Sequence, residues 1–539
     1  MARDSSTEAT AVRGGGQFYT RQSTGLVREM SVRDMFIITV VYISIIFGLV
    51  TLSIIPFAFP GASMSGSVLI SGLFALFPVL LYAFFAASMP RTGGDFIYVG
   101  RVLHPALGFM ANWNMTLWVV FFQAIQGGWI VGTGFSGMFY AIGVATNNRT
   151  LENWGADLQH AWPRFIGSMI VLALIGFVLS RGYRALMRMS IVLFVLMLIG
   201  LAVAIITSFL TTSADLNAAF HKAGTSTNAL LAAAHHAGYP AYGGFSFVAT
   251  LASLPLIWAV IGFSQVPAYA AGEMRSPRRN AVVSMTSSVI FCVLVFALTA
   301  FAITRFAPNS LVGSLEYLYQ NALKAWPYPV EPTVYFYPTI THGAVIAVFI
   351  WSAFLIGGFL TIPASLLVVT RNVFAWSFDR VLPSSLSTVD SKYHAPQRSI
   401  VVVVIIVAIC SAIFIFGPAN FTLFAFSGSA GQMLTFILVA VAGIVFAWRR
   451  PDLHDSSPYH RRIAGVPVFT WLGVISLAMF ACYFYLFMTN DALGANKPVG
   501  IWAIVIIFVT GGLVYAASYM INKRRGLDLL LGQRELPPE

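Results

Sequence analysis

The sequence predicts an all-α membrane protein with about twelve transmembrane helices, and three observations support this fold class. Of its 539 residues, 58% are hydrophobic and 9% are charged, whereas a soluble domain is about one quarter charged. Apolar stretches of the length needed to cross a bilayer recur along the chain. Arginine and lysine gather in every second connection between these stretches. We therefore expect a bilayer to be the main solvent.

The apolar stretches are long enough to cross about 30 Å of hydrocarbon as helices. The third is long enough to tilt. The expected spans are residues 35–59, 66–88, 109–143, 164–180, 189–211, 246–271, 282–304, 342–370, 399–416, 421–447, 467–489 and 498–521. Residues 1–30 are polar and lack the apolar core and cleavage site of a secretory signal, so we expect a disordered cytoplasmic tail. A second cytoplasmic tail is expected at 522–539.

The basic residues predict the orientation of the chain. With the N-terminus in the cytoplasm, 25 of the 31 lysines and arginines fall on the cytoplasmic side and six fall outside. Cytoplasmic connections retain positive charge during insertion, and one missed span would invert every later connection. We therefore expect a multi-pass protein of the plasma membrane with both termini in the cytoplasm. This distribution also explains the net charge of +12 without a nucleic acid partner.

Two spans contain candidate breaks in the helix. Span six carries Gly262–Pro267, where glycine has no side chain, proline has no N–H, and Ser and Gln can satisfy the freed backbone groups. A simple proline kink in a packed helix is the alternative interpretation. Span one has only Gly48 and Pro56 as helix-breaking residues, and Tyr42 and Ser44 are among its polar residues. The sequence therefore gives weaker evidence for a break in span one than for the matching break in span six.

Three motifs at predicted cytoplasmic boundaries resemble those of the amino acid-polyamine-organocation permease superfamily. The first is Met89–Tyr98, with a proline, a glycine pair and aromatic residues. The second is Gly262-Phe263 followed by Glu273–Asn280. The third is Thr370–Ala375 followed by Asp379–Pro383. Because all three occur in the family's order, the chain is identified as a member of this superfamily.

The resemblance implies an architecture and a function. The expected fold has two inverted five-helix repeats at 31–211 and 246–447, joined by an external loop at 212–245 and followed by two further spans within 448–521. The expected function is secondary active transport of amino acids or related small amines by alternating access around a central site. The expected partners are a small-molecule substrate and the lipid bilayer, and the oligomeric state is left open.

In this superfamily the substrate contacts exposed backbone at the breaks in spans one and six, where half-helix dipoles present partial charges. The resemblance therefore implies substrate contacts in both spans, with an aromatic gate on span six. The candidate substrate-binding residues are Tyr42, Ser44, Trp258, Gly262, Phe263, Ser264 and Gln265. Ile43–Phe47 replaces the family's Gly-small-Gly stretch, and its β-branched isoleucines narrow the site. Whether a carboxylate binds there is left open.

Charged residues at the cytoplasmic boundary are candidates for an inner gate. Arg91 and Asp95 lie in a predicted re-entrant loop after span two, and Glu273 ends span six. A structural ion pair between Glu273 and the neighbouring Arg275, Arg278 or Arg279 is the alternative for this acid. Solvated loop charges are the alternative for Arg91 and Asp95.

The acidic residues indicate the substrate class. None of the 19 lies deep in a predicted span, so the cavity has no counter-ion for a di-cation such as a polyamine. Aromatic faces and backbone dipoles suit a zwitterion or a monoamine, and neutral amino acids are the preferred class. No cofactor is expected, and the coupling ion, sodium or proton, is left open.

Two other functions compete with transport. An enzyme would need a catalytic or metal-binding cluster, and no HExxH, GxSxG or paired-aspartate motif is present, so we expect neither catalytic nor metal-ligating residues. A nutrient sensor that keeps a transporter fold but does not move solute is the alternative, which fold alone does not exclude.

Overall fold

The computed structural model describes residues 28–241, 244–390, 392–417 and 420–533. The predicted tail at 1–30 therefore lies outside the described residues except for its last three. Within the described ranges, twelve helical segments are long and apolar enough to cross a membrane, which confirms the predicted all-α class and number of spans. The inverted-repeat arrangement stays a prediction.

The spans are formed by single helices or by short helices in series. Span one is α1 (Val32–Ile43) with α2 (Ile45–Ala58), and span three is α5 (Pro105–Trp129), η1 (Ile130–Phe135) and α6 (Ser136–Thr146). Span six is α12 (Phe247–Ala252), α13 (Leu254–Ile261), η2 (Gly262–Gln265) and α14 (Val266–Tyr269). The other spans are α3 (Met64–Ser88), α8 (Ala161–Ser180), α9 (Tyr183–Leu210), α15 (Pro277–Thr304), α18 (Ala344–Phe378), α19 (Gln397–Phe416), α20 (Asn420–Arg449), α22 (Val468–Thr489) and α23 (Pro498–Arg524).

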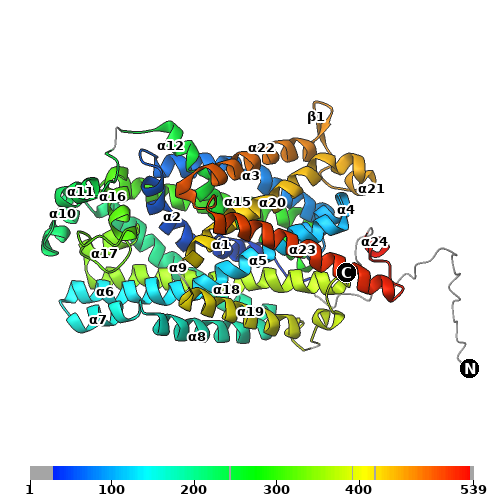
Figure 1. Ribbon diagram of the computed structural model, residues 1–539, viewed down its shortest axis with the longest axis horizontal. Coiled ribbons are helices and arrows are strands. Elements are labelled where there is room, and N and C mark those ends of the chain that lie inside the picture. Colours follow the sequence, from blue (N-terminus) through cyan, green and yellow to red (C-terminus); the bar gives the residue numbers. More distant parts are fainter. Residues whose placement is uncertain (1–27, 242–243, 391, 418–419, 534–539) are drawn as a thin grey trace, which may run out of the picture.

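Short elements gather at the two ends of the bundle (Figure 1). One end, called the α4 end below, holds α4 (Asp95–Val102), η3 (Ala271–Glu273), η4 (Ser384–Ser387), α21 (Pro451–Asp455), α24 (Leu529–Gly532) and the hairpin of β1 (Arg462–Ile463) and β2 (Val466–Pro467). The other end, called the cap, holds α7 (Arg149–Asp157), α10 (Ser213–Lys222), α11 (Thr227–His236), α16 (Asn309–Gln320), α17 (Phe336–His342) and η5 (Asp491–Leu493).

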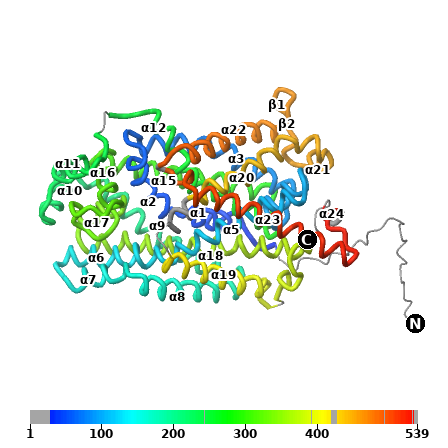
Figure 2. The backbone as a smooth tube through the Cα atoms, in the orientation of Figure 1, coloured from blue at the N-terminus to red at the C-terminus, as the bar shows by residue number. Residues whose placement is uncertain are grey.

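Span one lies in the middle of the bundle, where Figure 2 shows α1 and α2 surrounded by other helices. Its most apolar window is 89% buried within the protein, against 22% for α8, whose apolar face is left for lipid. Apolar residues drive both helices out of water, but only a segment with neighbours on all sides is buried by protein. Span one therefore has the position of a central helix.

The segment 212–245, predicted as an external loop, contains the helices α10 and α11. Thr212 forms a capping box with Asp215 at the start of α10, and the Ser226 side chain accepts a hydrogen bond from the Ala229 amide at the start of α11. Caps of this kind stabilise the first turn of a helix, and the many alanines of this segment favour helix over coil. The local sequence thus explains why this segment forms two helices rather than an irregular loop.

Candidate functional site

Span one is interrupted at Ser44. This residue has a φ of +56° and ψ of 81°, in the left-handed region, and it separates α1 from α2. Its side-chain oxygen accepts a hydrogen bond from the Phe47 amide at 3.3 Å, and its carbonyl accepts one from the Gly48 amide at 3.0 Å. The amides of Ile45 and Ile46 come first in α2, where a helix supplies no internal acceptor. The break thus leaves two N–H groups without a helical acceptor in the middle of the bundle.

Span six is interrupted at the predicted place. The α-helix α13 ends at Ile261, the 3₁₀ turn η2 follows, and α14 begins with Pro267 in its first turn. Proline has no N–H to donate and is favoured in the first turn of a helix, where no internal acceptor is available, so its position fits the start of the second segment. Both central spans are therefore discontinuous.

A cavity lies beside the break in span one. Its empty volume is about 720 Å³, including the part that opens to solvent. It is lined by Tyr42, Ile43, Ser44, Phe47, Val119, Phe122, Gln123, Ile125, Gln126, Trp129, Phe263, Thr361, Ser365 and Phe414. None of these side chains is charged, and most are aliphatic or aromatic. Such a lining suits an uncharged or zwitterionic solute with an apolar part.

The polar groups of the cavity come from three spans. Ser44 and Tyr42 belong to α1 and its break, Gln123 and Gln126 to α5, and Thr361 with Ser365 to α18. The Thr361 hydroxyl donates to the Val41 carbonyl at 3.0 Å and thereby ties α18 to the last turn of α1. Among the described residues, the Tyr42 hydroxyl and the Gln123 carbonyl oxygen have no hydrogen-bond partner. Unsatisfied buried polar groups beside a cavity are available to a ligand.

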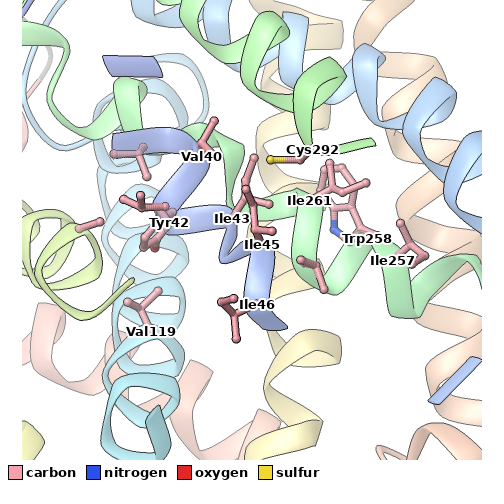
Figure 3. Packing of buried hydrophobic residues seen from close by; sticks show 14 of the residues in the cluster. Val40, Tyr42, Ile43, Ile45, Ile46, Val119, Ile257, Trp258, Ile261 and Cys292 are labelled. Atoms are coloured by element: carbon pink, nitrogen blue, oxygen red, sulfur yellow. The ribbon is translucent and has the colours of Figure 1, made fainter. Parts of the chain in front are cut away.

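The predicted substrate-binding residues fall into two groups. Tyr42, Ser44 and Phe263 line the cavity, and the Phe263 ring meets the Tyr42 ring edge to face at 5.3 Å. Trp258, Gly262, Ser264 and Gln265 are absent from its lining. Figure 3 shows Trp258 across span one from Tyr42 and Val119. The cavity therefore contacts span six through one residue of its break.

Trp258 has a packing role in this structure. Its ring contacts those of Phe436 and Phe480, with centroids 5.3 and 5.0 Å away, and it lies directly over Gly262. A Cβ atom at Gly262 would approach the Trp258 ring to 2.8 Å, so only glycine allows this contact. Ser264 and Gln265 are buried, and both ends of the Gln265 amide have no partner among the described residues.

Several cavity residues were not predicted as substrate contacts. Val119, Phe122, Gln123, Gln126 and Trp129 recur at the spacing of one face of α5. Gln123 and Gln126, one helical turn apart in the apolar second half of α5, are the signal that could have identified this stripe. Phe414 carries no such signal, because an aromatic residue in an apolar span is equally suited to lipid.

Two buried ion pairs close the α4 end. The Arg371 guanidinium donates to both oxygens of Glu273, with Nη2 to Oε2 at 2.9 Å, and Arg101 Nη2 lies 2.7 Å from Asp379 Oδ2. All four side chains are at most 5% exposed. The expected partners of Glu273 were Arg275, Arg278 or Arg279, whereas its observed partner is distant in sequence. A charge that is buried needs a close, well-aligned partner, and Arg371 supplies two bonds.

Arg91 and Asp95, the other two gate candidates, lie in different environments. Arg91 Nη1 donates to the carbonyl of Pro90 at 3.0 Å. Asp95 is fully buried, and neither of its oxygens has a hydrogen-bond partner among the described residues. Asp95 is the first residue of α4, and the loop before it is fixed to span six, because the Gly93 amide donates to the Tyr269 carbonyl at 3.1 Å.

Comparison with known proteins agrees with this architecture. Residues 34–513 match the family model described as amino acid permease. The branched-chain amino acid permease BcaP of Bacillus subtilis is 23% identical over 485 residues, which cover 86% of each chain. The methylthioribose transporter of the same organism is 22% identical over 460 residues, covering 84% of this chain and 85% of the other. Since the family model covers most of the sequence, this chain belongs to the amino acid permease family, a family of membrane transporters rather than enzymes.

Proposed function

We propose that this permease carries neutral, zwitterionic amino acids with an apolar side chain, by alternating access around the cavity beside Ser44. The observation that carries this proposal is the uncharged cavity next to a broken helix. A charged side chain on the substrate would have to be desolvated there without a counter-ion, which costs several kcal/mol.

The break in span one suits the two ends of a zwitterion. The amides of Ile45 and Ile46 stand at the N-terminus of α2, where the helix dipole favours a carboxylate. The last carbonyls of α1 stand at a C-terminus, where an ammonium group is favoured. In this proposal Phe47, Trp129 and Phe414 contact the apolar side chain of the substrate.

The names of two relatives support a substrate without net charge. One is a branched-chain amino acid permease, whose stated substrates carry apolar side chains, and the other is a methylthioribose transporter. A cavity with aromatic walls and a few amide and hydroxyl groups is compatible with both kinds of solute. The zwitterion is favoured because the helix ends at Ser44 supply partial charges of both signs.

The proposed orientation places the α4 end in the cytoplasm, because 25 of the 31 basic residues lie on that side of the predicted spans. In the described conformation this end is closed by the two buried ion pairs. The cavity extends from Ser44 towards Trp129, at the end of α5 that is distant from α4. Transport would require the α4 end to open after the opposite side has closed.

Uptake into proteoliposomes tests this function. We expect saturable uptake of labelled leucine that unlabelled valine and isoleucine compete for, whereas lysine and glutamate do not. Gln126→Leu keeps the approximate shape of the side chain and removes a polar cavity group, so the apparent KM should rise about tenfold, the effect of losing a hydrogen bond of 1–1.5 kcal/mol. Asn153→Leu, at an exposed amide on α7, is the matched control.

Three other outcomes would count against the proposal. Equal competition by lysine would contradict the uncharged site. Preference for methylthioribose over every amino acid would contradict the proposal that the substrate is a zwitterion. Leucine binding to the purified protein without any flux, either down a gradient or in exchange, would favour the nutrient sensor.

A further inference from the structure

Asp95 is a buried acid for which the transport cycle described above has no role. It is the first residue of α4, its side chain is fully buried, and both carboxyl oxygens lack a hydrogen-bond partner among the described residues. An ionised carboxylate in such a place is costly, and proteins normally avoid it by pairing or by protonation. The arginines nearest in sequence are engaged elsewhere, since Arg101 pairs with Asp379 and Arg91 donates to Pro90.

Polar groups from four other elements surround this carboxyl group. Tyr42 of α1, Tyr82 of α3 and Tyr269 of α14 interact electrostatically with Asp95, and the side chain of Asn112 on α5 also faces it. The three tyrosine hydroxyls are buried and have no hydrogen-bond partner in the described part of the chain. Each tyrosine hydroxyl, and the carboxyl group when protonated, can donate a hydrogen bond, so this cluster is able to hold a proton in the interior.

The titration of Asp95 falls in a range that a transporter can use. Burial raises its pKa to about 6, while the nearby Tyr269 hydroxyl and Asn112 amide oppose this increase. Within the described part of the chain, the other titratable groups found to interact with it are the three tyrosines, which are neutral at this pH. Exposure of the carboxyl group to water would return its pKa towards the ordinary value near 4 and release the proton.

Asp95 is linked to both the cavity and the moving part of the structure. Tyr42 lines the cavity and also interacts electrostatically with Asp95. The loop before Asp95 pairs with span six, with Thr92 opposite Ala270 and the Tyr269 ring resting on Gly94. Movement of the inner half of span six would therefore change the surroundings of the carboxyl group.

We propose that Asp95 is the proton-binding site that couples solute transport to a proton gradient. A proton from the outer solution forms an O–H bond with one carboxyl oxygen of Asp95, through the Tyr42 side of the cavity, while the α4 end is closed. When the α4 end opens, water reaches the carboxyl group, the O–H bond breaks and the proton leaves to the cytoplasm. One proton then accompanies each solute. This inference rests on the proposed transport function.

The test uses the full chain in proteoliposomes loaded at pH 7.5, with the membrane potential clamped. Lowering the external pH to 5.5 should drive accumulation of leucine several-fold above equilibrium in the native protein. Asp95→Asn imitates the protonated carboxyl group. It should abolish this accumulation, keep exchange of internal for external leucine, and remove the pH dependence of leucine affinity. Asp157→Asn, at an exposed acid on α7, should behave like the native protein.

A second variant covers the case in which Asp95→Asn does not fold. Tyr269→Phe removes a hydroxyl that lowers the pKa of Asp95, so the pH midpoint of leucine affinity should rise by about 0.5–1 unit. Gradient-driven accumulation by Asp95→Asn equal to that of the native protein, or an unmoved midpoint in Tyr269→Phe, would overturn the inference. Exchange without any response of the native protein to the pH gradient would overturn it as well, while leaving the transport function intact. Absence of both binding and exchange in the native protein would instead overturn the proposed function.

Discussion

At the α4 end two buried acids face arginines, whereas in the cap two glutamates face each other. Glu273 and Asp379 each pair with a buried guanidinium. In the cap, Glu316 of α16 is fully buried and lies beside Glu331, and the only donor hydrogen-bonded to it in the described structure is Gln320, at 2.7 Å. Glu273 and Asp379 are therefore neutralised by an opposite charge, whereas the Glu316–Glu331 pair is neutralised by a proton.

The difference determines how each end responds to pH. Burial and the nearby Glu331 carboxylate raise the pKa of Glu316 well above its ordinary value, and burial raises the pKa of Glu331 to about 7. Two carboxylates cannot donate to each other, so a hydrogen bond between these two carboxyl groups requires a proton on one of them. Glu316 Oε2 has no other donor among the described residues. An ion pair with arginine needs no such proton. The two ion pairs at the α4 end should thus hold across neutral pH, whereas the glutamate pair of the cap should not.

The largest effect is expected from Glu273→Gln. This change leaves the buried Arg371 guanidinium without its counter-charge, which typically costs about 3–5 kcal/mol. Asp491→Asn, which breaks the exposed pair with Lys497, is the matched control and should cost at most about 1 kcal/mol. Thermal unfolding of the purified variants in detergent measures both. An equal loss of stability in the two variants would show that burial does not determine how much an ion pair contributes.

A smaller, pH-dependent effect is expected in the cap. Because the folded-state pKa values of Glu316 and Glu331 are raised above the ordinary 4.5, their contribution to stability is fully present below pH 4.5 and is lost as the pH rises through about 7. Hydrogen exchange of the α16 amides should therefore accelerate between pH 5 and pH 8, after correction for the intrinsic pH dependence of exchange.

Glu331→Gln sharpens this test, because a neutral amide can donate to Glu316 at every pH. The acceleration of exchange in α16 should then largely disappear. Asp215→Asn in α10 is the control, since hydrogen bonds from Thr212 lower the pKa of Asp215 and its stabilising effect is lost only on acidification. Exchange in Glu331→Gln that retained the native pH dependence would assign the effect to another group.

The spans could be predicted from the sequence because each is encoded in one continuous run of residues. A run of about 20 apolar residues indicates a span whatever its neighbours are, and the twelve predicted stretches correspond to the twelve observed ones. The break in span six was predictable for the same reason, since Gly262 and Pro267 weaken a helix locally. Its contribution to the cavity was not, because only Phe263 points there.

The break in span one depends on tertiary structure. Serine resists a positive φ, so the residues of span one do not by themselves indicate a break at Ser44, and only the family resemblance placed it within Ile43–Phe47. Gly48 lies under the Phe296 ring, where any side chain would collide with it. Ser44 is accommodated by its own hydrogen bond to Phe47 and by the neighbouring bond from Thr361 to Val41. Such contacts between distant spans leave no pattern in the local sequence.

The smallest expected effect compares single hydroxyl groups at the two ends. Tyr98 at the α4 end donates to the buried Ala268 carbonyl at 3.1 Å, and Tyr317 in the cap donates to the exposed Ala237 carbonyl at 2.7 Å. Tyr98→Phe leaves a buried acceptor unsatisfied and should cost about 1–3 kcal/mol, whereas water can replace the lost bond in Tyr317→Phe, which should cost about 0.5–1 kcal/mol. Thermal unfolding of the two variants measures the difference. The Tyr317 bond is the shorter of the two, but it lies in solvent. A larger loss of stability in Tyr317→Phe than in Tyr98→Phe would mean that the cap, rather than the α4 end, limits the stability of the protein.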